Sequence, residues 1–148
     1  MDCPPSSLRT CLDYLKKGSD QCGIYRVFDG DGRPFNVYCD MNSEKGSAWT
    51  LVESMGAYYQ KRPPFKNTPF KVNAPVREDD FNWEEYRLSL HHMNSLKTNS
   101  THWRATCSYP TYGVDYTDYA RGKFAEFDIM TFLGAGVCKK VTNTCQEL

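Results

Sequence analysis

The stretch Cys11–Thr50, CLDYLKKGSDQCGIYRVFDGDGRPFNVYCDMNSEKGSAWT, decides the fold. Residues 23–28 are β-branched and aromatic, residues 29–32 (DGDG) favour a turn, and residues 34–39 suit a return strand. In that return strand Phe35, Val37 and Cys39 share one face because side chains alternate along a strand. We therefore predict a hairpin with one buried face that carries Cys39.

A short helix is predicted before the hairpin. Leu8, Leu12 and Leu15 recur at helical spacing, Ser6–Ser7 can cap its start, and Gly18 can end it. Cys11 on this helix is the expected partner of Cys39. A bond between them would close a loop of about 29 residues and stabilise the fold by roughly 3.5 kcal/mol on the chain-entropy model.

The same residues carry a resemblance to a known family. GIY at residues 23–25, PFNVYCDM at 34–41, and Gly46 followed by Trp49–Thr50 resemble the opening of fibrinogen C-terminal (fibrinogen-related) domains. Ser47–Ala48 departs from the family pattern, which usually has two glycines before the tryptophan. Residues 81–87 resemble the family's Trp-x-x-Tyr segment, and residues 86–96 equally resemble a later helix of the family.

The resemblance implies an α+β fold: a short N-terminal helix, a disulfide-stapled hairpin, then a mixed, mainly antiparallel sheet with one packed helix. It implies one domain over residues 1–148, with a stapled part at 1–53, a Pro-rich basic surface excursion at 54–77, and a central helix-and-sheet part at 78–148. The family's calcium loop and ligand pocket would lie beyond Leu148. No cofactor, metal or binding residue is therefore carried over, and the ligand site is unknown.

The remaining segments predict further elements. Residues 48–53 suit a third, mostly buried strand, and the prolines of 59–75 exclude a helix or central strand there. A helical tract is expected from Glu78 through Leu96, with its acids at the N-terminal end. Residues 102–107 and 114–121 suit a second antiparallel hairpin, and residues 124–133 suit another strand or a buried loop.

Charge and apolar content limit the classes of function that the sequence allows. Lys plus Arg and Asp plus Glu are each 18, so no basic stripe favours nucleic acid. No run of 18 apolar residues suggests a membrane span. Residues 1–5 lack the apolar stretch of a signal peptide, so we expect the chain to start at a fragment boundary.

Seven cysteines favour an oxidising, extracellular location. Cys3 and Cys22 flank the first helix and are one candidate pair; Cys107 and Cys138 are another, which leaves Cys145. An odd cysteine allows a bond to another chain. Zinc is disfavoured because the chain has no Cys-x-x-Cys and no close Cys/His quartet.

Candidate chemical groups are few. His91 and His92 are neighbours, about 100° apart on a helix, without the i, i+4 spacing of a helical metal site. The DGDG segment lacks the later ligands of a calcium loop. The other catalytic suspects are one histidine and four acids: His102, Asp115, Asp118, Glu126 and Asp128.

Asn99–Ser100–Thr101 is an N-glycosylation acceptor in an expected loop. The sequence thus predicts a secreted, non-catalytic recognition, adhesion or matrix module for a glycan or protein ligand, of the kind found in innate-immune lectins. The alternative is a secreted hydrolase that uses His and carboxylate residues.

Overall fold

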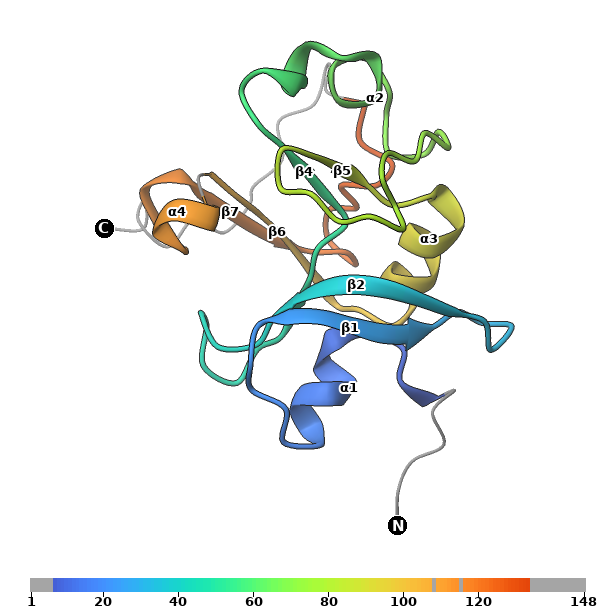
Figure 1. Ribbon diagram of the computed structural model, residues 1–148, viewed down its shortest axis with the longest axis vertical. Coiled ribbons are helices and arrows are strands. Elements are labelled where there is room, and N and C mark those ends of the chain that lie inside the picture. The colour runs from blue at the N-terminus through green and yellow to red at the C-terminus, as the bar shows by residue number, and fades with distance from the viewer. Residues whose placement is uncertain (1–6, 108, 115, 134–148) are drawn as a thin grey trace. The chain divides into compact units, whose positions relative to one another are not determined.

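A computed structural model describes residues 7–107, 109–114 and 116–133 (Figure 1). The chain divides into two compact units. One comprises residues 1–68 and 72–99, and the other comprises residues 69–71 and 100–148. The described residues contain helices and small antiparallel sheets, which confirms the predicted α+β class.

The first unit is built on the predicted hairpin. Strands β1 (Gly23–Phe28) and β2 (Pro34–Asp40) pair antiparallel from Gly23↔Cys39 to Phe28↔Pro34, and β3 (Trp49–Thr50) adds to the other edge of β2. The predicted inward face is confirmed, because Phe35, Val37 and Cys39 are buried.

Helix α1 (Cys11–Lys16) precedes the hairpin and is tied to it by the predicted Cys11–Cys39 disulfide, whose Cα atoms lie 5.6 Å apart. The predicted start at Ser6–Ser7 was wrong. Thr10 is the N-cap, and the carboxylate of Asp13 accepts hydrogen bonds from the backbone N–H groups of Arg9 and Thr10. These bonds satisfy donors that a helix start leaves open, so the helix begins at Cys11.

The predicted strand at residues 48–53 is two short strands in different sheets. After β3 the chain leaves the first sheet, and β4 (Glu53–Met55) pairs antiparallel with β5 (Glu85–Arg87). The backbone N–H of Leu51 still donates to Tyr38, whereas Val52 accepts from Leu88. The partner strand therefore changes between residues 51 and 52.

The helix predicted from Glu78 begins twelve residues later, as α3 (Leu90–Thr98). Ser89 is its N-cap, and its side-chain oxygen accepts from the backbone N–H of His92. The preceding Tyr86 and Arg87 are buried in β5. Strand pairing and the serine cap thus outweigh the helical spacing of the apolar residues.

The proline-rich stretch contains only single turns: a 3-10 helix at Tyr59–Lys61 and α2 (Pro63–Lys66), whose two prolines occupy the first helical positions. The buried side chain of Arg87 holds this stretch in place by hydrogen bonds. Its guanidinium donates to the carbonyl oxygens of Pro64, Thr68 and Val72 at 2.6, 2.9 and 2.9 Å.

The second unit contains the second predicted hairpin, with shifted bounds. Strand β6 (His102–Thr106) pairs antiparallel with β7 (Tyr119–Lys123), and the connection holds α4 (Tyr109–Tyr112) and a 3-10 helix at Tyr116–Asp118. Residues 124–133 form turns and irregular structure, with Met130 buried. The buried indole of Trp103 donates to the carbonyl of Phe127 at 2.8 Å.

Candidate functional site

Asp29 opens the turn between β1 and β2 and is buried. Its Oδ1 accepts from the backbone N–H groups of Asp31 and Arg33, both at 2.9 Å, while Oδ2 lies 2.9 Å from Nε2 of His91. The guanidinium of Arg9 donates to the Asp29 carbonyl. The hydrogen bond with His91, then those with the backbone, lower the pKa of Asp29 to about 2. Asp29 is therefore a fixed carboxylate anion at neutral pH.

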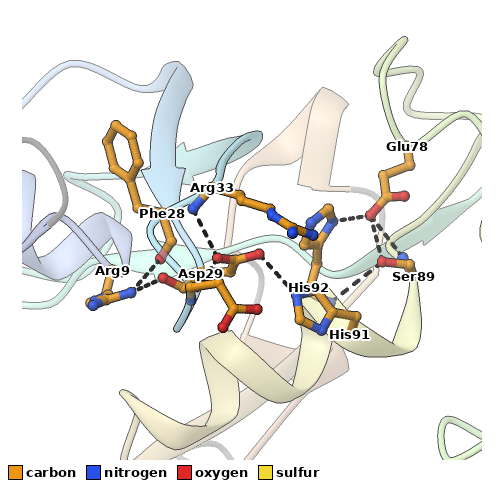
Figure 2. Close-up of polar contacts among 9 residues, drawn as sticks. Arg9, Phe28, Asp29, Arg33, Glu78, Ser89, His91 and His92 are labelled. Carbon is orange, nitrogen blue, oxygen red and sulfur yellow. Dashed lines mark hydrogen bonds and ion pairs between the residues drawn. The ribbon is translucent and has the colours of Figure 1, made fainter.

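His91 and His92 lie in the first turn of α3, next to this carboxylate (Figure 2). The His91 side chain is 60% exposed, whereas that of His92 is 19% exposed and stacks on Phe35 with ring centroids 3.9 Å apart. The Nδ1 of His92 contacts Oε1 of Glu78. Each histidine thus has a carboxylate partner from a different part of the first unit.

Glu78 is held in turn by Ser89, the cap of α3. Its Oε1 accepts from the backbone N–H and the hydroxyl of Ser89, at 3.0 and 2.8 Å. Burial raises the pKa of Glu78, but the hydrogen bonds from Ser89 and His92 outweigh burial and leave the pKa below its usual value. Glu78 is therefore a second anion that orients the imidazole of His92.

One ligand-type atom from each of Asp29, His91 and His92 lies within 4.8 Å of the other two. The spacing argument from the sequence missed this group. Asp29 is 62 residues from His91 and faces it only because the hairpin turn reaches the start of α3. Two imidazoles and a carboxylate are ligands that Zn²⁺ takes in proteins.

A pocket of about 290 Å³ lies beside this cluster in the first unit. Seven residues line it: Ile24, Asn36, Glu78, Asp79, Asp80, Phe81 and Tyr86. Glu78 lines the pocket and also contacts His92 of the cluster. The pocket therefore combines three carboxylates and an amide with apolar and aromatic surface, which suits orientation of a polar ligand by a few hydrogen bonds.

Aromatic packing surrounds Phe81, one of the residues that line the pocket. The ring of Phe81 packs against Tyr38, Trp83 and Tyr86, with centroids 5.3, 5.0 and 5.0 Å away. Burial raises the pKa of Tyr86, and Glu78 and Asp79 raise it further, so its hydroxyl stays neutral. By contrast, Ile24 is 49% exposed and Asp79 is also exposed, so both are open to a ligand.

The other catalytic suspects have local contacts. His102 Nδ1 lies 2.7 Å from the Thr101 hydroxyl, Glu126 lies 3.9 Å from Lys123, and the Asp128 carboxylate accepts from the Met130 backbone N–H. Asp118 ends the 3-10 helix before β7. Asp115 lies outside the described residues. These local contacts stabilise turns and strand ends.

The remaining cysteine predictions are open. Neither Cys22 nor Cys107 forms a disulfide with another of the described residues, and the Cys22 sulfur accepts from the Met41 backbone N–H at 3.4 Å. Their predicted partners, Cys3 and Cys138, lie outside the described residues, as does Cys145. Both pairings therefore stay predictions.

The acceptor residue Asn99 is exposed at the C-terminal cap of α3, in the predicted connection to β6. Its side-chain amide donates to the carbonyl of Ser95 at 3.0 Å. Glycosylation at this amide stays a prediction.

Within the part of the chain that the structure describes, no helix has the length and apolar character needed to cross a bilayer.

Comparison with known proteins identifies the family. Ryncolin-4 from Cerberus rynchops is 31% identical over 52 residues, a stretch that spans 35% of this chain and 15% of ryncolin-4. The sequence profile of "Fibrinogen beta and gamma chains, C-terminal globular domain" matches residues 7–103, which is more than half of the chain. This match covers the stapled hairpin, the pocket and the histidine cluster, and the chain belongs to the fibrinogen C-terminal domain family.

Proposed function

We propose that this chain is a non-catalytic extracellular recognition module, which binds a glycan or protein ligand for adhesion, matrix assembly or innate defence. The observation that carries the proposal is the family match over residues 7–103. The buried Cys11–Cys39 disulfide supports an extracellular location, because such bonds persist in oxidising compartments.

The pocket beside Phe81 is the proposed ligand surface. Carboxylates and an amide can bind sugar hydroxyls or a basic peptide group, and apolar surface next to them adds contact area. Asp79 and Ile24 are the residues to test, because both are exposed on the lining and can be changed without opening the core.

Binding to glycan arrays and to arrays of matrix proteins and basic peptides tests the proposal. For a ligand found in this way, Asp79→Asn and Ile24→Ser should each weaken the affinity about tenfold, which corresponds to about 1.4 kcal/mol. Asp20→Asn and Met55→Ser change equivalent exposed residues outside the pocket lining and should leave the affinity unchanged. Equal affinities for all four variants would contradict the assignment of the pocket.

The proposed non-catalytic character has its own test. The alternative, a secreted hydrolase, would use a His–carboxylate pair, and Asp29 with His91 is such a pair. We expect no turnover of generic esters or glycans. Turnover that His91→Gln abolishes would contradict the non-catalytic part of the proposal.

A further inference from the structure

We propose that Asp29, His91 and His92 bind a divalent transition-metal ion, Zn²⁺ in particular, and that this ion clamps the β1–β2 turn to the start of α3. From the sequence we expected no metal site at these histidines, because they lack the i, i+4 spacing of a helical site. The three proposed ligands are not among the residues that line the ligand pocket.

The geometry of the three groups is close to that of a metal site. Their ligand-type atoms lie within 4.8 Å of one another, and the closest pair, Asp29 Oδ2 and His91 Nε2, is 2.9 Å apart. Two ligands of a tetrahedral zinc ion with bonds of about 2.1 Å are about 3.4 Å apart. A small rotation of the His91 ring would lengthen the distance towards this spacing, because that side chain is 60% exposed.

Neighbouring groups already orient two of the ligands. Backbone N–H groups hold Oδ1 of Asp29, which leaves Oδ2 for the ion. Glu78 occupies Nδ1 of His92, which leaves Nε2 as its metal ligand. A carboxylate on the second ring nitrogen of a metal-binding histidine fixes its orientation and raises its basicity.

Charge and access also suit a cation. Asp29 and Glu78 place two carboxylates at the site, which match the charge of a divalent ion. They also offset the positive N-terminal end of α3, where the histidines lie. The exposed His91 leaves a coordination position open to water, so the site would hold three protein ligands and a solvent molecule.

The experiment is a zinc titration by calorimetry, together with Co²⁺ absorption spectra, on the folded chain with free thiols alkylated. Alkylation is needed because any free thiol, including Cys22 or Cys107 where these are unpaired, also binds such ions. We expect one equivalent of Zn²⁺, a cobalt spectrum without thiolate charge-transfer bands, and a rise in Tm on binding.

Variants distinguish a metal-binding cluster from one that is held together by hydrogen bonds alone. His91→Gln, at an exposed side chain, should weaken zinc binding at least about tenfold and remove the rise in Tm, and Glu78→Gln should weaken it about tenfold through His92. His102→Gln changes the third histidine and should have no effect. Lack of zinc binding at millimolar concentration by the folded chain, or binding that His91→Gln and His92→Gln leave unchanged, would overturn the proposal.

Discussion

The guanidinium of Arg87 lies 3.5 Å from the carboxylate of Glu53, and the two side chains are only 1% and 12% exposed. Arg87 sits on β5 and Glu53 on β4, at directly paired positions of the two strands. Burial lowers the pKa of Arg87 and raises that of Glu53 to about 7, although each charge partly offsets the effect on the other. The Arg87 guanidinium also donates three hydrogen bonds to backbone carbonyls.

Replacement of Arg87 by Met should therefore destabilise the chain strongly. It leaves the carbonyls of Pro64, Thr68 and Val72 without their donor and Glu53 without its counter-charge, a loss of about 3–5 kcal/mol. Urea unfolding measures this loss of unfolding free energy. Arg62→Met removes an arginine that is 52% exposed and pairs with Glu85, and should cost no more than about 1 kcal/mol. Similar losses for both variants would contradict the structural role of Arg87.

Glu53 should make stability fall as the pH rises. Its folded pKa of about 7 exceeds the ordinary value of 4.5, so the folded state holds a proton that the unfolded state has lost between these values. This contribution is full below pH 4.5 and disappears as the pH rises through 7, by at most about 3 kcal/mol at 1.36 kcal/mol per pKa unit. Glu53→Gln should remove this part of the pH dependence in urea unfolding between pH 5 and pH 8. An unchanged slope would show that Glu53 is ionised in the folded chain throughout.

Asp29 should act in the opposite direction. Its folded pKa of about 2 is below the ordinary 3.8, so its contribution is full above pH 3.8 and is lost as the pH falls towards 2. With a chelator present, Asp29→Asn should be less stable than the parent at pH 7, and this difference should shrink across that acidic window. Asp31→Asn, at an exposed neighbour in the same turn, should unfold like the parent both at pH 7 and across the acidic window.

Gly122 should not tolerate a side chain. A Cβ atom there would lie 2.7 Å from the ring of Trp103, which is buried against β7 and hydrogen-bonded to Phe127. Gly122→Ala should cost about 1–3 kcal/mol and shift the Trp103 indole N–H resonance. Gly30→Ala, where a Cβ meets nothing within 4 Å, is the matched control and should change stability by less than about 0.5 kcal/mol.

The sequence was informative where the physical cause is local. Residues 23–40 form the predicted hairpin because alternation and turn chemistry act over neighbouring positions, and that hairpin brings Cys39 to Cys11. The helix predicted from Glu78 failed because Tyr86 and Arg87 pair with β4, which lies some thirty residues earlier. Only tertiary structure could supply that competition.

The same reason explains the missed site. His91 and His92 drew attention as adjacent histidines, but their carboxylate partners come from residues 29 and 78, and no spacing rule joins these positions. No sequence pattern predicted the role of Arg87 either, because its partners are mostly backbone carbonyls. The residues that line the pocket also come from distant parts of the chain: the hairpin, the segment before β5, and β5 itself.

The central claim, a stapled extracellular module of the fibrinogen family, is tested most directly by peptide mapping of the chain under non-reducing conditions, after secretion from eukaryotic cells. We expect one peptide pair joined through Cys11 and Cys39, and a loss of about 3.5 kcal/mol in unfolding free energy for the Cys11→Ala/Cys39→Ala variant, from a bond that spans 28 positions. Folded, secreted protein in which both cysteines are alkylated without prior reduction would contradict the account.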